Sequence, residues 1–197
     1  MKKVFSFILF FCLSLSCSLF VQDKDTVSNS GYTCFTIYGE DHFIGISLPD
    51  YWTVDMDFAH EHNFNGFFYI KDQSINPEAF IILGLYEKRD DLTFDDFINY
   101  MVTSLRDYQP DYSVEKIATE KYSSRMNNWN LSLYELKKKS GHGVYENIAY
   151  MECENKYYLE MYISFSDDTV STKEKYLKDF IKSIHEIEYL NAKVEEK

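Results

Sequence analysis

The residues of this sequence best suited to bind a metal are two histidines one position apart, His60 and His62, on either side of Glu61. On a β-strand this spacing places both imidazoles on one side, where their neutral nitrogens bind zinc or copper. A third ligand would have to come from Asp57 or from the distant His142. An exposed polar loop explains the same residues without a metal, so His60 and His62 are weak candidates, and we predict no metal and no cofactor.

The four cysteines fall into two groups by position. Cys12 and Cys17 lie within or directly after an apolar N-terminal segment, whereas Cys34 and Cys153 lie in the body of the chain. In an oxidising compartment Cys34 and Cys153 could form one disulfide, and two buried free thiols are the alternative. Neither of these two residues has a sequence context that indicates an activating base, so we predict no catalytic cysteine.

The N-terminus has the pattern of a secretory signal. Two lysines follow Met1, and residues 4–15 are uncharged and rich in Phe, Leu and Ile. A short basic region ahead of an apolar segment of this length is typical of an export signal. The small residues Ser14 and Ser16 fit a signal peptidase site, which predicts a signal peptide over residues 1–16.

The cysteine directly after this site resembles the lipobox cysteine of bacterial lipoproteins. Residues 14–17, Ser-Leu-Ser-Cys, carry the resemblance, although the lipobox usually has leucine at the first of these positions. In that family the cysteine becomes the mature N-terminus and receives fatty acyl chains such as palmitate, so the resemblance implies lipidation of Cys17. The alternatives are cleavage without lipid after Ser16 or Ser18, and retention of residues 4–21 as an anchor. Each of the three exports the domain.

The charge balance limits the class of partner. The chain has 20 Lys and Arg against 32 Asp and Glu, a net charge of −12. Cleavage before Cys17 removes two lysines and no acidic residue, which leaves the mature chain at −14. An acidic surface repels phosphate and gains nothing from counterion release, so we predict no nucleic-acid partner. The 17 tyrosines and 16 phenylalanines indicate a folded core rather than a disordered chain.

Composition also predicts the organisation of the mature chain. Residues 18–33 are polar and contain Ser, Asn and Gly, so we predict a lipidated N-terminus and flexible tether over residues 17–33. No repeat, low-complexity block or proline-rich linker interrupts residues 34–190, which we predict to form a single domain. Residues 191–197 are predicted to be a disordered tail.

Two segments repeat their apolar residues at the spacing of an α-helix, Thr93–Tyr108 and Thr172–Tyr189. Thr93 is the predicted N-cap of the first helix, because acidic residues follow it in the first turn. Ser171 followed by Glu174 has the form of a capping box for the second helix.

Most of the remaining chain alternates apolar and polar residues with period two, as β-strands do. Residues 79–86 are apolar on both faces, which predicts a central strand of a covered sheet. An Asn155-Lys156 turn would make residues 143–165 a long hairpin. The predicted strands are residues 43–48, 66–70, 79–86, 113–121, 129–134, 145–153 and 157–165. This order predicts an α+β fold with an antiparallel sheet of about seven strands flanked by helices.

Two motifs resemble those of Mog1/PsbP-like domains, a family that includes small bacterial exported proteins of the DcrB type. Residues 43–54, Phe-Ile-Gly-Ile-Ser-Leu-Pro-Asp-Tyr-Trp-Thr-Val, resemble the opening strand, Pro-x-x-Trp turn and second strand of these domains, and Tyr51 differs from the glycine often found there. Residues 92–98, Leu-Thr-Phe-Asp-Asp-Phe-Ile, resemble their Thr-Leu-x-x-Phe helix start. The resemblance covers about residues 34–190. It implies an α/β/α sandwich and a binding or assembly role without catalysis.

Two surfaces are candidates for partner contact. Tyrosines concentrate in the late strands, at Tyr134, Tyr145, Tyr150, Tyr157, Tyr158 and Tyr162. An exposed tyrosine-rich face would suit a partner, whereas a helix packed over that face, or a compositional bias, explains them without one. Lys137–Lys139 could touch acidic lipid or an acidic partner, but lysines at a hairpin tip are usually a solvated edge.

These observations predict an exported, lipid-anchored, non-catalytic binding module of the bacterial cell envelope, periplasmic or at the outer surface, with a protein or envelope partner. One alternative is an accessory or chaperone protein for secretion or envelope assembly, which would need an apolar groove for a partner helix. The other is a metal-binding protein or enzyme whose site combines distant residues such as His42, His60, His62 and His142.

Overall fold

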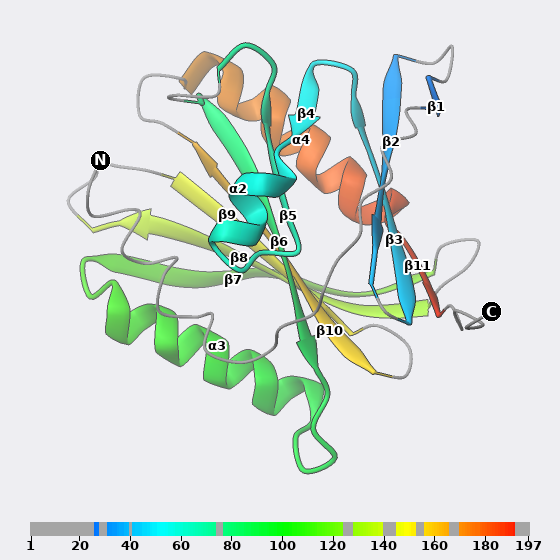
Figure 1. Ribbon diagram of the computed structural model, residues 1–197. Coiled ribbons are helices and arrows are strands. Elements are labelled where there is room, and N and C mark those ends of the chain that lie inside the picture. Colours follow the sequence, from blue (N-terminus) through cyan, green and yellow to red (C-terminus); the bar gives the residue numbers. More distant parts are fainter. Residues whose placement is uncertain are drawn as a thin grey trace.

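The computed structural model of this chain describes residues 26–27, 31–39, 41–73, 77–123, 128–139, 145–152, 156–165 and 170–191 (Figure 1). In chain order the elements are β1 (Thr26–Val27), β2 (Tyr32–Tyr38), β3 (His42–Pro49), β4 (Trp52–Val54), α2 (Met56–Glu61), β5 (Gly66–Ile70), β6 (Ala79–Glu87), α3 (Phe94–Tyr108), β7 (Tyr112–Ser123), β8 (Asn128–Lys138), β9 (Tyr145–Glu152), β10 (Tyr157–Phe165), α4 (Val170–Glu186) and β11 (Glu188–Asn191). Within these ranges no helix is long and apolar enough to cross a membrane.

The larger sheet has seven antiparallel strands in the order β4-β5-β6-β10-β9-β8-β7. β6 lies inside it, between β5 and β10, as its two apolar faces predict. Ile81 and Leu83 of β6 pack into the core on one side of the sheet, and Ile82 packs into the core on the other. β9 and β10 pair as the predicted hairpin, with Leu159 opposite Met151.

The strand pattern does not predict a second sheet, which has four strands in the order β1-β2-β3-β11. Residues 43–48, assigned above to the larger sheet, form most of β3 in this smaller one. Pro49 ends β3, and the turn at Asp50 and Tyr51 leads into β4, which pairs with β5 of the larger sheet. Alternation identifies a strand but not its neighbour, so the assignment of residues 43–48 to the larger sheet is wrong.

Two segments of the smaller sheet fall within residues 17–33, the predicted tether. β1 pairs with the beginning of β2 there, with Thr26 opposite Cys34 and Val27 opposite Thr33. A strand of two residues is too short to produce an alternating pattern in the sequence. The predicted signal segment lies outside the described residues, as do residues 192–197 of the predicted tail, whereas Asn191, the first residue of that tail, ends β11.

The structure confirms the first predicted helix as α3, with Thr93 as its N-cap. The Thr93 hydroxyl accepts a hydrogen bond from the backbone N–H of Asp96 at 3.2 Å. The Asp96 carboxylate accepts one in return from the backbone N–H of Thr93 at 3.1 Å. This reciprocal cap satisfies two backbone donors that the first turn would otherwise leave unpaired.

The second predicted helix is shifted toward the N-terminus. α4 begins at Val170, which places Ser171 inside the helix rather than at its cap, and it ends at Glu186 rather than Tyr189. Tyr189 instead lies in β11, opposite Ile44 of β3. The apolar spacing of the helix continues through Ile187, so the pattern alone cannot locate the change from helix to strand.

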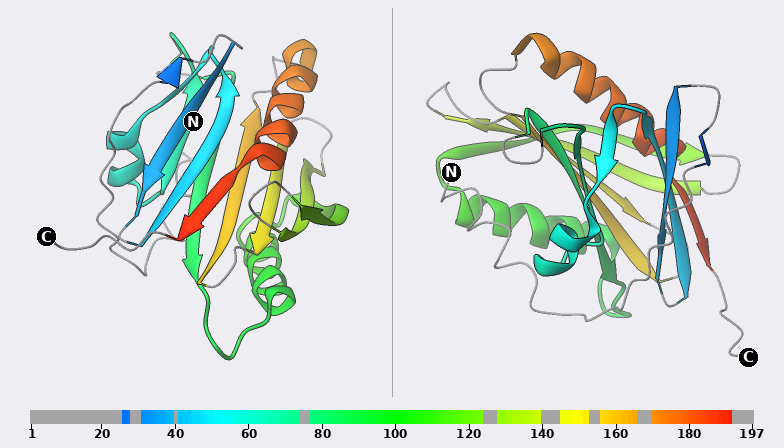
Figure 2. Two further views of the ribbon diagram at one scale, coloured as in Figure 1. Left: turned by 90° about the vertical axis from the view of Figure 1, so that its right-hand side faces the viewer. Right: turned by 45° about the horizontal axis from the view of Figure 1, so that its top comes forward.

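The larger sheet separates two hydrophobic cores. Figure 2 shows α3 on one side of this sheet and α4 on the other. On one side α3 and α2 cover the sheet, with Phe97 and Met101 of α3 buried against it. On the other side α4 and the four-stranded sheet pack together, with Trp52 and Phe180 fully buried. The structure therefore confirms the predicted α+β class, an antiparallel sheet of seven strands flanked by helices.

Candidate functional site

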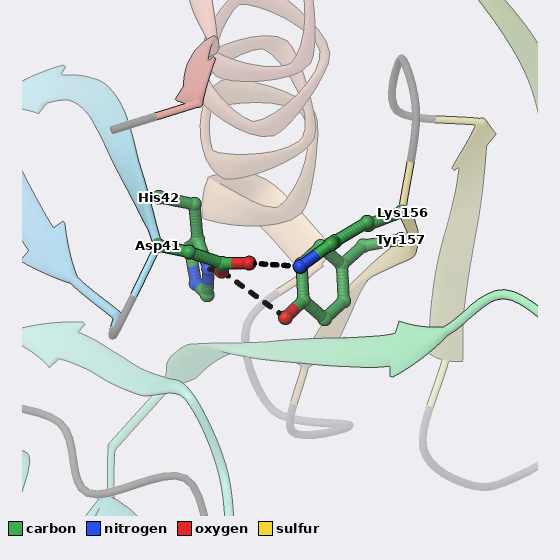
Figure 3. Close-up of polar contacts among 4 residues, drawn as sticks. All are labelled: Asp41, His42, Lys156 and Tyr157. Carbon is green, nitrogen blue, oxygen red and sulfur yellow. Dashed lines mark hydrogen bonds and ion pairs between the residues drawn. The ribbon is translucent and has the colours of Figure 1, made fainter. Parts of the chain in front are cut away.

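Four polar and aromatic residues meet where the two sheets approach each other: Asp41, His42, Lys156 and Tyr157 (Figure 3). His42 and Tyr157 are the first residues of β3 and β10, and Asp41 and Lys156 directly precede them. Asp41 Oδ2 lies 2.5 Å from Lys156 Nζ, and the Tyr157 hydroxyl donates a hydrogen bond to Asp41 Oδ1 at 3.2 Å. We call these four residues the junction cluster.

The charge of Asp41 is stabilised from several sides. Its Oδ1 lies 3.0 Å from Nδ1 of His42, within hydrogen-bond distance. The hydrogen bond from Lys156, followed by that from His42, lowers the pKa of the Asp41 carboxyl to about 2, against an ordinary value of 3.8. The aspartate is therefore ionised over the whole physiological range.

The imidazole of His42 is enclosed by rings and backbone. It is 1% exposed, and it lies between Tyr157, at 4.9 Å between ring centroids, and Tyr189, at 5.8 Å and nearly parallel. A Cβ atom on Gly39 would lie 2.1 Å from Cε1 of His42, so only glycine allows the chain to pass this close to the ring.

A carboxylate that orients Nδ1 of a histidine is part of the arrangement by which hydrolases prepare a general base. Such a base must also present its other ring nitrogen to a reactant. Nε2 of His42 is buried and has no hydrogen-bond partner among the described residues. The geometry instead makes the junction cluster a connection between β3 of the smaller sheet and β10 of the larger one.

Two acidic residues lie between the larger sheet and α3, Glu146 buried and Glu160 partly buried. Glu146 is 2% exposed, and burial raises its pKa to about 7 against the opposing effect of a hydrogen bond from Tyr162. Burial likewise raises the pKa of Glu160 to about 7, although its carboxylate accepts a hydrogen bond from the Tyr86 hydroxyl at 2.6 Å. Both carboxyls face aromatic neighbours rather than basic ones, so each favours its neutral form.

Most of the tyrosines of the late strands lie on this same side of the sheet, beneath α3. Tyr134, Tyr150, Tyr158 and Tyr162 are all at least nine-tenths buried, and Tyr158 stacks on Phe97 of α3 at 4.4 Å between centroids. The structure therefore supports the alternative of a helix packed over this face, and these four tyrosines are core rather than contact surface. Tyr157 points to the opposite side and belongs to the junction cluster.

Tyr51 and Trp52 of the Pro-x-x-Trp turn make a second polar contact, with Asp179 on the α4 side of the sheet. Trp52 is fully buried, and its Nε1 donates to Asp179 of α4 at 3.4 Å. The Tyr51 hydroxyl also donates to Asp179. Burial and the adjacent Asp179 carboxylate raise the pKa of the Tyr51 hydroxyl. Tyr51 thus holds the turn to α4.

The two candidate metal histidines lie at the end of a short helix, not on a strand. His60 belongs to α2 and is exposed, and His62 is the C-cap of that helix. The His62 ring stacks on Phe58 at 4.1 Å between centroids, and its Nδ1 lies 2.9 Å from the Phe58 carbonyl oxygen. No group of three or more His, Cys, Asp or Glu among the described residues has the geometry to hold a metal ion.

Of the candidate cysteines and the distant His142, the structure describes only Cys34. Cys34 lies on β2, half-buried and near Ser47, and burial raises the pKa of its thiol. Cys153 and Cys17 lie outside the described residues, as does His142. The disulfide between Cys34 and Cys153 and the lipidation of Cys17 therefore remain predictions.

Sequence reasoning did not single out Asp41 or the acids Glu146 and Glu160. A signal exists for Glu160, which alternates with Tyr158 and Tyr162 on the face that α3 covers. Once a helix is assigned to that face, a glutamate in the middle of the pattern indicates a buried carboxyl. Asp41 has no comparable signal, because its partners Lys156 and Tyr157 are more than 100 residues away.

No protein-family model matches this sequence, and no curated protein matches it. Among solved structures the chain is similar to cyanobacterial PsbP (CyanoP) from Synechocystis sp. PCC 6803, with 12% identity over 86% of this chain and 98% of that chain and a TM-score of 0.54. It also aligns with the Ran-binding protein Mog1p of Saccharomyces cerevisiae, at 9% identity over 89% and 96% of the two chains, with a TM-score of 0.48. The likeness to PsbP establishes a Mog1/PsbP-like fold, and at this identity it establishes the fold alone.

Proposed function

We propose that this protein is an exported, lipid-anchored binding module of the bacterial cell envelope that works without catalysis. The order of segments along the chain carries the proposal. A basic start, an apolar segment and Cys17 precede a polar stretch, and a PsbP-like fold follows. This order suits a domain that is exported and then held at a membrane by its N-terminus.

The packing of the titratable groups supports a role without catalysis. The junction cluster contains an aspartate-histidine pair, but the imidazole is enclosed between two tyrosine rings. The two carboxyls with raised pKa, Glu146 and Glu160, lie beneath α3. A general acid or base must reach the atom it protonates or deprotonates, and these groups are packed against the protein instead.

A binding module of this shape would meet its partner through helices, edges or loops, because both faces of the larger sheet are covered. Among the described residues four large apolar side chains are exposed: Tyr100 at 65%, Ile117 at 51%, Tyr108 at 41% and, on β11, Leu190 at 39%. Tyr100 and Tyr108 lie on α3, and Ile117 lies on β7, an edge strand of the larger sheet. We therefore expect a protein or envelope component, not nucleic acid, to bind on the α3 and β7 side.

Photo-crosslinking in the native envelope tests this function. A photoreactive residue would replace Tyr100 or Ile117, and an exposed position elsewhere, Lys71, would serve as the control. We expect a discrete adduct from position 100 or 117 and none from position 71. The adduct should also disappear in Cys17→Ala, because the domain would leave the membrane. Equal, diffuse labelling from all three positions would overturn the proposal.

A further inference from the structure

Helix α4 carries three lysines along its outer face, at spacings of three and four residues: Lys175, Lys178 and Lys182. Residues at this spacing lie on one side of a helix. Lys175 and Lys178 are exposed, and the side chain of Lys182 is 40% exposed. We call these three residues the α4 lysine row. It is a concentration of positive charge in a chain whose net charge is −12.

The same helix carries three acidic residues and a fourth, partly buried lysine, Lys173, so that its four lysines exceed its acids by one charge. Asp179 is buried and takes the hydrogen bonds of Tyr51 and Trp52. Glu186 lies 3.6 Å from Lys182 Nζ, where both side chains are well exposed and the pairing is weak. Glu174 is exposed on the first turns of the helix.

Two of the three lysines of this row lie over tyrosine rings. Lys175 Nζ lies 3.7 Å from the ring centroid of Tyr51, and Lys182 Nζ lies 3.5 Å from that of Tyr32. An ammonium group over an aromatic face is attracted by the ring quadrupole while its outer side stays open to solvent. Tyrosine beside lysine is also the combination found at the level of lipid headgroups, where one end of the ring is apolar and the other polar.

The lysine row lies close to the point where the chain enters the domain. Tyr32, beneath Lys182, is the first residue of β2. β1 begins at Thr26, which pairs with Cys34 only two residues beyond Tyr32. α4 and the strands of this smaller sheet lie on the same side of the larger sheet (Figure 2).

The length of chain ahead of Thr26 limits its distance from a lipid on Cys17. Eight residues, 18–25, separate the two positions. Fully extended, this stretch spans about 30 Å at most, roughly the diameter of a small domain. A lipid on Cys17 would therefore hold Thr26, and the β2 strand that it pairs with, within about 30 Å of the headgroups.

We propose that the α4 lysine row, with Tyr32 and Tyr51, is the surface by which this domain lies on anionic lipid headgroups. The nearness of the membrane rests on the proposed lipid anchor, whereas the surface itself rests on the lysine and tyrosine geometry. Phosphate headgroups attract the row, and the excess of acidic charge over the whole chain disfavours other orientations. The anchor supplies a high local concentration of membrane, so a modest attraction suffices to orient the domain.

Vesicle binding tests the surface independently of the lipid. The protein would carry Cys17→Ala, and the readout is the ratio of binding to phosphatidylcholine vesicles with and without about 30% phosphatidylglycerol. Each lysine near an anionic surface contributes about fivefold in binding, so Lys175→Gln/Lys178→Gln/Lys182→Gln should reduce this ratio about 100-fold at low salt. The matched control is Lys116→Gln/Lys121→Gln/Lys138→Gln, which removes the same charge from exposed positions on β7 and β8. This control should retain the ratio within about threefold.

Equal loss in the two triple variants, or no preference of the parent protein for anionic vesicles, would overturn the proposal. A second measurement uses the wild-type chain and therefore does not depend on the folding of any variant. The protein is treated with an acetylating reagent in solution and when bound to anionic vesicles. Bound vesicles should protect Lys175, Lys178 and Lys182 from acetylation and leave Lys116 and Lys121 as reactive as in solution. Unchanged reactivity of the α4 lysines would also overturn it.

The two proposals fail in different ways. If Cys17 carries no lipid, the intact mass of the wild-type protein shows this, and the vesicle ratio of the Cys17→Ala protein is unaffected. If the lysine variant binds anionic vesicles as its parent does but loses a crosslinked envelope protein, the row is a protein-contact surface and the lipid assignment is wrong.

Discussion

Asp41 and Lys156 connect the two sheets through an ion pair, with Oδ2 of the aspartate 2.5 Å from Nζ of the lysine, across 115 positions of sequence. Asp41 directly precedes β3, and Lys156 directly precedes β10. His42 and Tyr157 contact the other carboxylate oxygen. The four residues thus fix the four-stranded sheet against the larger one at a single place.

This cluster predicts a loss of stability in acid. The folded-state pKa of Asp41 is about 2, below its ordinary value of 3.8. The ionised aspartate therefore stabilises the fold fully above about pH 4, and this contribution is lost as pH falls from about 4 to about 2. Asp41→Asn should lower the free energy of unfolding at pH 6, and the difference from wild type should shrink toward pH 2. Urea unfolding across this range measures it.

Asp91→Asn provides the control for that experiment. Asp91 pairs with Arg89 at 2.8 Å, but both side chains are about two-thirds exposed. An exposed pair of this kind contributes little to stability. A change of equal size and pH dependence in both variants would contradict the account of the junction cluster.

The close approach of Gly39 to His42 predicts the effect of one added methyl group. In Gly39→Ala the new Cβ would lie 2.1 Å from the imidazole, which cannot move freely because Tyr157 and Tyr189 lie against it. We expect a loss of about 1–3 kcal/mol in the free energy of unfolding. Gly45→Ala is the matched control, since its nearest contact would be an ordinary 3.6 Å to Glu188. Equal denaturation midpoints for the two variants would count against the packing described here.

The buried carboxyl of Glu146 predicts a gain in stability on substitution. Its folded-state pKa of about 7 lies above the ordinary value of 4.5, so the folded protein holds its proton more tightly than the unfolded chain does. The free energy of unfolding therefore falls as pH rises from about 4.5 through 7. Glu146→Gln should be more stable than wild type at pH 8, by about 1–3 kcal/mol, and the gain should be smaller at pH 5. Thermal unfolding at the two pH values measures the difference.

Glu120→Gln is the control for burial, because Glu120 is exposed on β7. It removes the same charge and should change stability by less than about 0.5 kcal/mol at either pH. A stabilisation of Glu146→Gln that is the same at pH 5 and pH 8 would show that ionisation is not its cause.

The N-cap of α3 predicts that removal of the Thr93 hydroxyl lowers the stability of the protein. Thr93→Ala removes the hydroxyl that accepts the Asp96 N–H and donates to the Asp96 carboxylate at 2.6 Å. We expect a loss of about 1 kcal/mol. Thr103→Ala, at an exposed position inside the same helix, should be neutral or slightly stabilising because alanine favours helix. Chemical denaturation of the two variants compares them, and an equal loss in both would mean that the cap contributes nothing specific.

Periodicity in the sequence predicts the elements whose patterns are long. The pattern predicts β6 from its two apolar faces and α3 from six residues at spacings of three and four: Phe94, Phe97, Ile98, Met101, Leu105 and Tyr108. β1 and β11 have two and four residues, too few for a pattern, and β11 continues the apolar spacing of α4. The smaller sheet was therefore missed, although its longest strand, β3, was recognised as a strand.

The candidate site was less predictable than the fold. His42 was noted only as one histidine among several, because Tyr157 and Tyr189, which enclose it, are distant in sequence. His60 and His62 looked like strand ligands because two-residue spacing suggests alternation, whereas Asp55 caps a helix that begins at Met56. Sequence spacing describes neighbours within an element, and the site depends on contacts between elements.

The modification state of Cys17 is the central question of the proposed function. The most direct test is the intact mass of the protein purified from membranes, for the wild type and for Cys17→Ala, together with partition of both into detergent. We predict that wild-type protein begins at Cys17, carries the mass of attached acyl chains and partitions into detergent, and that Cys17→Ala lacks the lipid and remains in the aqueous phase. Wild-type protein without added mass, partitioning as Cys17→Ala does, would contradict the lipid anchor.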